Sequence, residues 1–138
     1  MKLHTIEKPL LAIVVPCFNE ENVLPKSSNK LFEKIDFLKS NNIIHDGSYI
    51  LFVDDGSRDK TKIIIEDLNN QNSSFKGLSL SRNFGHQNAL AAGLHYVSSR
   101  CDISISLDSD LQDDINVIDE FIDEYKNSDC PILFIDAD

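Results

Sequence analysis

The chain has 138 residues, of which 41% are hydrophobic and 26% are charged, a composition typical of a single soluble globular domain. Its net charge of −10 argues against nucleic-acid binding, because no cluster of basic residues is available to neutralise phosphates. No apolar run approaches the ~20 residues that a membrane-spanning helix needs.

The cysteines and the N-terminal region indicate the compartment. Cys17, Cys101 and Cys130 are odd in number and lack the spacing of a metal site, which favours free thiols in a reducing compartment. The apolar run at residues 10–15 is too short for a signal peptide and is closed by Pro16. We therefore expect a cytoplasmic protein.

The first strand and helix are predicted from the start of the chain. Residues 10–15 form a continuous apolar run, as expected of a parallel strand that is covered on both faces. Asn19 is a candidate N-cap for the helix that follows, and Pro25 is expected to kink or restart this helix near its beginning. The apolar residues of this helix fall on one face: Leu24, Leu31, Ile35 and Leu38.

A second strand and helix are predicted after a polar loop. Residues 49–53 are apolar and predict another buried strand. A helix is expected to begin near Asp59 and to carry three apolar residues: Ile63, Ile64 and Leu68.

Residues 77–80 predict a short third strand, and residues 86–98 predict the next helix. Small residues in this helix permit close approach to the sheet, with a matching small face offered by Ser104 and Ser106. The small helical residues are Ala89, Ala91, Ala92 and Gly93.

A fourth strand is predicted from the alternation of Ile103, Ile105 and Leu107 with polar residues. Helical spacing follows over residues 115–125, and residues 131–135 predict a fifth strand shortly before the sequence stops. Strands that alternate with helices indicate an α/β fold, with a mostly parallel sheet flanked by helices. We expect residues 1–138 to form one domain, truncated after the fifth strand.

An acidic cluster ends the fourth strand, where an open α/β sheet binds its ligands. Asp108 and Asp110 can offer oxygen ligands to Mg²⁺ or Mn²⁺ and leave coordination sites for a diphosphate, and Gln112 can add an amide oxygen. The alternative is a solvated acidic turn that caps the next helix, with Asp113 or Asp114 as N-cap.

Other strand ends offer further ligand contacts, each with a structural alternative. Phe18 can lie against a base or ribose and Glu20 can accept from a hydroxyl, unless this segment is only a turn. Asp54 and Asp55 can accept hydrogen bonds from a base or ribose, although an Asp-Gly turn is also common in loops. Arg82 can contact a phosphate or sugar, although a single arginine is more often a surface residue.

Two more observations bear on the kind of ligand. His86, at a predicted helix start, can donate to a ligand, and a capping or surface role is an equal alternative. The sequence has no Gly-x-Gly-x-x-Gly motif and no Walker loop. A nucleotide site in this chain would therefore rely on a metal ion to hold the diphosphate.

Four motifs occur in order: Val15–Glu21, Phe52–Thr61, Leu80–Leu90 and Leu107–Asp113. Together they resemble the family 2 glycosyltransferases with the GT-A fold, and most closely the polyprenyl-phosphate enzymes of the dolichol-phosphate mannose synthase and bactoprenol glucosyltransferase type. The resemblance extends from about residue 10 to residue 125.

The resemblance implies an inverting, metal-dependent transfer of a sugar from a nucleotide sugar, of the UDP-glucose or GDP-mannose type, to a polyprenyl phosphate. It allows peripheral association with the cytoplasmic face of the membrane. It implies that Asp108, Asp110 and Gln112 hold Mg²⁺ or Mn²⁺. The residues expected at the nucleotide sugar are Pro16, Phe18, Glu20, Val53, Asp54, Asp55, Arg82, Ser109 and Asp110.

Within that set, the resemblance places Pro16, Phe18 and Glu20 around the nucleoside, Val53 with Asp55 at the base, and the backbone near Ser109 at the ribose and diphosphate. Family members usually continue well beyond this length and carry the acceptor site there, so any catalytic base is expected in the missing half. Two alternatives stay open: a nucleotide-sugar-binding module without transferase activity, and a truncated fragment that self-associates as a homo-oligomer through an exposed sheet edge.

Overall fold

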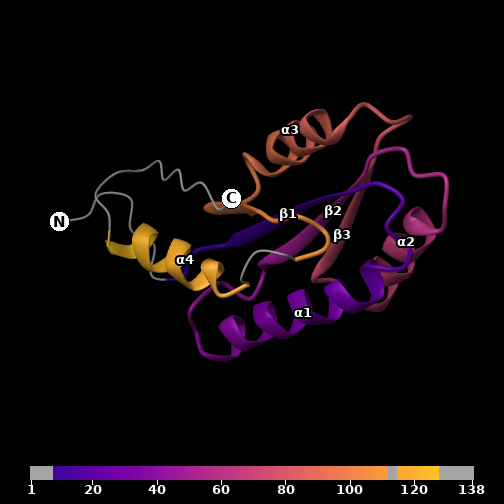
Figure 1. The fold of residues 1–138 in the computed structure, drawn as a ribbon. Helices are drawn as coiled ribbons and strands as arrows, with labels where there is room; N and C mark the ends of the chain where they lie inside the picture. The colour runs from indigo at the N-terminus through magenta and orange to yellow at the C-terminus, as the bar shows by residue number, and fades with distance from the viewer. Residues whose placement is uncertain (1–7, 112–114, 128–138) are drawn as a thin grey trace.

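A computed structural model describes residues 8–111 and 115–127, and within them four strands alternate with four helices (Figure 1). The strands run parallel in the order β3-β2-β1-β4. This arrangement confirms the predicted α/β fold with a parallel sheet. The elements are β1 (Leu11–Cys17), α1 (Leu24–Ser40), β2 (Tyr49–Asp54), α2 (Thr61–Gln71), β3 (Phe75–Ser79), α3 (His86–Val97), β4 (Ile103–Ser106) and α4 (Val117–Asn127).

The strand order reverses at β1, which lies between β2 and β4. From β1 the chain moves outward to β2 and then β3, and α1 and α2 cover one face of the sheet (Figure 1). It then returns through α3, on the opposite face, to place β4 on the other side of β1. In open α/β sheets the crevice for a ligand forms at such a reversal, outside the carboxyl ends of the strands.

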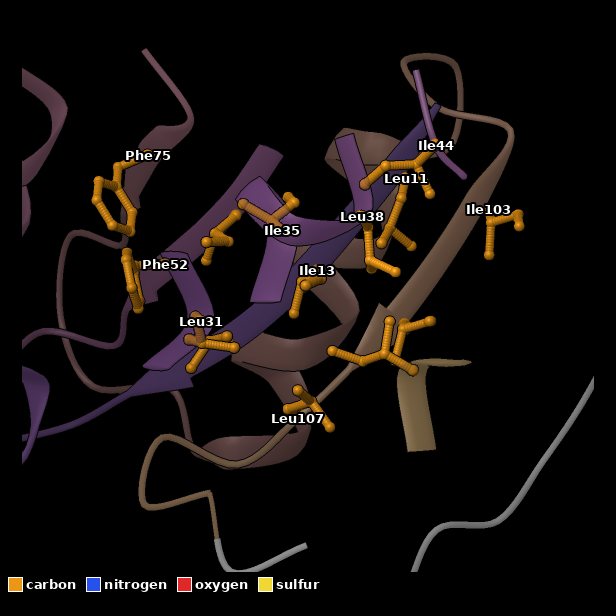
Figure 2. Close-up of a cluster of buried hydrophobic side chains, with 14 of the residues drawn as sticks. Leu11, Ile13, Leu31, Ile35, Leu38, Ile44, Phe52, Phe75, Ile103 and Leu107 are labelled. Carbon is orange, nitrogen blue, oxygen red and sulfur yellow. The ribbon is translucent and has the colours of Figure 1, made fainter. Parts of the chain in front are cut away.

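A large hydrophobic core lies between the sheet and helices α1, α2 and α4 (Figure 2). Every residue of β1 is buried, which confirms the prediction of a strand covered on both faces. Because successive side chains of a strand point to opposite faces, Leu11 and Ile13 join this core, whereas Ala12 and Val14 face α3. None of the described helices is both long and apolar enough to cross a bilayer.

Helix α3 lies close to the sheet because Ala89 and Gly93 are buried against it. A Cβ atom built at Gly93 would lie 2.6 Å from Cγ1 of Val14 and 2.8 Å from Cγ2 of Val53. The prediction that Ser104 and Ser106 form a small face against this helix is wrong, since both are exposed on β4. The close approach is made over β1 and β2 instead.

We expect Gly93→Ala to lower the free energy of unfolding by up to about 2 kcal/mol, because an overpacking penalty of about 1–3 kcal/mol is offset by a helix-propensity gain of about 1 kcal/mol. Urea denaturation measures the loss. As the control, Val14→Ala makes room for the added methyl, so Gly93→Ala should cost less in that background. An equal cost in both backgrounds would contradict the packing explanation.

Several local predictions need correction. β3 begins at Phe75 rather than residue 77, because the Phe75 ring stacks on Phe52 with 5.9 Å between centroids. In α2, Ile64 and Leu68 pack against the core as predicted, whereas Ile63 is 57% exposed and Ile65 is buried instead. Of the two predicted effects of Pro25, a kink is not found: α1 begins at Leu24, and Pro25 lies in the first turn, where a proline costs no hydrogen bond.

The two predicted helix caps have different outcomes. Val23, rather than Asn19, is the N-cap residue of α1, and no side chain caps this helix. Asp113 and Asp114, the candidate caps of α4, lie outside the described residues, as does the predicted strand at residues 131–135.

Candidate active site

The carboxyl ends of β1, β2 and β4 meet the N-terminus of α3 around a pocket of about 560 Å³. The pocket lies where the strand order reverses, at the carboxyl ends of the strands, which is where the predicted site residues were expected. Seven of those residues line it: Pro16, Phe18, Glu20, Asp55, Asp108, Ser109 and Asp110. The others that line it are Cys17, Asn83, Gly85, His86 and Ala89.

Asn19 ties the loop after β1 to the loop after β2. It adopts a left-handed backbone conformation, with φ of 52°, which asparagine tolerates better than most residues. Its backbone N–H donates to Ser57 Oγ at 2.9 Å, and its Oδ1 accepts from the Arg58 N–H at 2.8 Å. These reciprocal bonds fix the segment that carries Phe18, which is 42% exposed at the pocket.

A second tie fixes Glu20, whose N–H donates to Oγ1 of the fully buried Thr61 at 2.8 Å. Asp59 completes this tie: its Oδ1 accepts from the Thr61 N–H at 2.9 Å and its Oδ2 from the Glu21 N–H at 3.2 Å. Burial alone would raise the pKa of the Asp59 carboxyl, but these hydrogen bonds outweigh burial and lower that pKa. The ionised carboxylate therefore holds the two loops together.

Asp55 joins the loop after β2 to the start of α3. Its Oδ1 accepts from the Phe84 N–H at 2.8 Å, and its Oδ2 accepts from the Gly85 N–H at 3.1 Å and from Asn83 Nδ2 at 3.2 Å. Its own N–H donates to the Cys17 carbonyl at 2.9 Å. Asp55 is only 3% exposed, so this buried carboxylate positions three other residues that line or flank the pocket.

The two carboxylates predicted to bind metal stand on a turn after β4. The Leu111 N–H donates to the Asp108 carbonyl at 3.0 Å, and Leu111 has a φ of 52°. This turn buries Ser109, which is 6% exposed, and leaves Asp108 and Asp110 exposed on either side of it. Nε2 of His86, from the start of α3, lies 3.8 Å from Oδ1 of Asp108.

The donor set fits a divalent cation that takes part of its coordination from a ligand. Among the described residues no three His, Cys, Asp or Glu side chains converge as a complete metal site. Asp108 and Asp110 line the same pocket and offer carboxylate oxygens, the ligands that Mg²⁺ and Mn²⁺ prefer. Gln112, the third predicted ligand, lies outside the described residues.

Three predicted site residues do not line the pocket. Val53 is fully buried in the cluster beneath α3, where it contacts the position of Gly93. Asp54 is also buried, and its Oδ1 accepts from the Ser57 N–H at 3.1 Å within its own turn. The exposed Arg82 lies with its guanidinium carbon 4.5 Å from the centroid of the Phe84 ring.

Four pocket residues were not predicted: Cys17, Asn83, Gly85 and Ala89. Three of these lie in the motif Leu80–Leu90, from which sequence reasoning selected only Arg82 and His86. Burial, with Glu20 and Asp54 nearby, raises the pKa of the Cys17 thiol far above its usual range, so the thiol stays protonated. Cys17 and Cys101 are free cysteines, and Cys130 lies outside the described residues.

Comparison with known sequences points to one family. Residues 12–138 match the model of glycosyl transferase family 2. An uncharacterised glycosyltransferase of Bacillus subtilis, YkoT, is 48% identical over 92% of this chain and 37% of its own length. A prophage bactoprenol glucosyl transferase homologue of Escherichia coli is 38% identical over 84% of this chain and 35% of its own length. The chain thus spans about a third of the length of these relatives.

Comparison with solved structures confirms the predicted fold. Staphylococcus aureus TarS, solved in complex with UDP, is 26% identical with a TM-score of 0.61, over 83% of this chain and 32% of the other. A mannosyltransferase of Pyrobaculum calidifontis, solved with GDP-Man and Mn²⁺, is similar in fold alone, at 18% identity and a TM-score of 0.59. That match covers 75% of this chain and 28% of the mannosyltransferase.

Proposed function

Because the chain belongs to glycosyl transferase family 2, we propose that its pocket binds a nucleotide sugar together with Mg²⁺ or Mn²⁺ as the donor site of a glycosyltransferase. One observation carries this proposal. The aromatic and acidic residues after β1 and the two aspartates after β4 line one pocket, although about ninety residues separate them in the sequence.

Each wall of the pocket has a chemistry that suits part of the ligand. Phe18 offers an exposed aromatic face to a base or ribose, and Glu20 can accept a hydrogen bond from a ribose hydroxyl. At the end of β4, Asp108 and Asp110 would hold the cation beside the diphosphate. The bound cation would stabilise the negative charge that develops on the departing nucleoside diphosphate.

The proposed acceptor is a polyprenyl phosphate, and the proposed transfer inverts the anomeric carbon in a single displacement. The bactoprenol glucosyl transferase homologues, 38% identical to this chain, support that acceptor. A phosphate monoester has a second pKa of about 6, so it is already an anionic nucleophile near neutral pH. For this reason the described residues need not supply a general base.

We expect one nucleotide to raise the melting temperature of the full chain only when Mn²⁺ or Mg²⁺ is present. The nucleotides to compare are UDP, GDP, UDP-glucose and GDP-mannose. A ligand at 100 times its dissociation constant adds about 2.7 kcal/mol to the free energy of unfolding. Asp108→Asn and Asp110→Asn should each abolish this stabilisation, because each removes a carboxylate from the cation.

Asp67→Asn is the matched control, because it removes the same charge from an exposed position on α2. It should keep the full nucleotide response. A folded wild-type chain that responds to no nucleotide would contradict the donor-site proposal. Where binding is found, transfer of labelled sugar to a polyprenyl phosphate in detergent tests turnover, and binding without transfer would favour a nucleotide-sugar-binding module.

A further inference from the structure

The pocket carries an excess of negative charge that its proposed ligand would have to overcome. Four acidic side chains line it: Glu20, Asp55, Asp108 and Asp110. Among the described residues that line it there is no lysine or arginine. A nucleoside diphosphate is itself an anion, so beyond the cation it needs hydrogen-bond donors from the protein. The lining offers few side-chain hydrogen-bond donors, and the imidazole of His86 is the largest of these side chains.

We propose that His86 binds the diphosphate of the nucleotide directly, by donating an imidazole N–H to a phosphate oxygen beside the cation. This inference rests on the proposed function, and it adds a specific contact that selects the diphosphate over the nucleoside. Neither the family comparison nor the predicted ligand set assigns this role to His86.

The position of the imidazole supports the proposal. Its Nε2 lies 3.8 Å from Oδ1 of Asp108, the proposed cation ligand. This distance is too long for a hydrogen bond. The imidazole therefore lies at ion-pair distance from the carboxylate, without a hydrogen bond to it. The side chains of both residues are more than half exposed, at 54% and 60%, so both can reach the same bound group.

The backbone around His86 is fixed in advance. Asp55 holds the N–H groups of Phe84 and Gly85, the two residues before His86. His86 is also the first residue of α3, a helix of 12 residues, and no side chain caps this end. The positive end of the helix dipole therefore faces the same pocket as the imidazole, and both favour an anion there.

Calorimetric titration of the full chain with UDP, UMP and uridine in Mn²⁺ tests the contact, or with the guanosine series if GDP is the nucleotide that binds. A hydrogen bond to a charged group predicts that His86→Ala weakens diphosphate binding by about tenfold or more. Nucleoside binding should change less than twofold. His86→Gln keeps an N–H donor and should recover part of the loss.

His95→Ala is the matched control, because His95 is exposed near the far end of the same helix and does not line the pocket. It should leave the affinity for the diphosphate unchanged. Equal losses for diphosphate and nucleoside in His86→Ala, or no loss for either, would overturn the His86 contact while leaving the donor site intact. Absence of all nucleotide binding in the wild-type chain would overturn both proposals.

Discussion

Gly56→Ala should destabilise the folded chain by about 2–5 kcal/mol, from overpacking and from the left-handed backbone together. Gly56 has a φ of 68°, and a Cβ atom there would lie 2.3 Å from the Arg82 carbonyl carbon and 2.4 Å from the Asn83 nitrogen. These obstacles are backbone atoms, which cannot rotate away as a side chain does. Two loops would have to separate, and both carry pocket residues.

Urea denaturation measures this loss, and Gly85→Ala separates its two causes. Gly85 also has a positive φ, of 98°, but nothing lies within 4 Å of a Cβ atom built there. Gly85→Ala should therefore cost only the backbone strain, about 1–3 kcal/mol. A loss for Gly56→Ala no larger than the left-handed backbone alone explains, about 1–2 kcal/mol, would show that the close contact between the loops carries no penalty.

Asp55→Ala is the second variant for which we expect a large effect, a loss of about 2–4 kcal/mol in the free energy of unfolding. It removes the acceptor of two backbone N–H groups, at Phe84 and Gly85, and of the Asn83 side chain. These N–H donors would lose their acceptor, so the free-energy cost of removing them from water would no longer be offset by a hydrogen bond. The local effect should be equally clear, because the Phe84 and Gly85 amides should lose protection from hydrogen exchange.

Asp54→Ala is the natural control, because Asp54 is as buried as Asp55 but its side chain accepts a hydrogen bond within its own turn. It should leave the exchange of the Phe84 and Gly85 amides unchanged. If Asp55→Ala left these two amides as protected as in the wild type, the carboxylate would not be what holds the loop. Its principal role would then be the base contact that the family resemblance implies.

The sheet was predictable because its strands are marked by local patterns. β1 reads as a continuous apolar run and is buried along its whole length, while β4 alternates and buries one face. Phe75 was missed because its burial depends on the rings of Phe52 and Phe32, which are distant in sequence. A pattern within a few residues carries no information about such a contact.

The pocket could be located from the sequence, but the role of each residue could not. The carboxyl ends of parallel strands share one edge, so a position after a strand predicts proximity, and seven predicted residues line the pocket. Whether a side chain turns toward that edge depends on contacts made elsewhere. Val53 faces α3 because of strand parity, and Asp55 turns to the Phe84 and Gly85 amides, which lie about thirty residues later.

The order of the strands also determines when the pocket can exist during synthesis. β1, β2 and β3 can pair once the chain as far as Ser79 has left the ribosome. A chain that ends before β4 lacks the three lining residues that follow this strand, Asp108, Ser109 and Asp110. The pocket is completed only by the most distant strand pairing in the sheet, that of Leu11 with Ile103, which closes the longest loop.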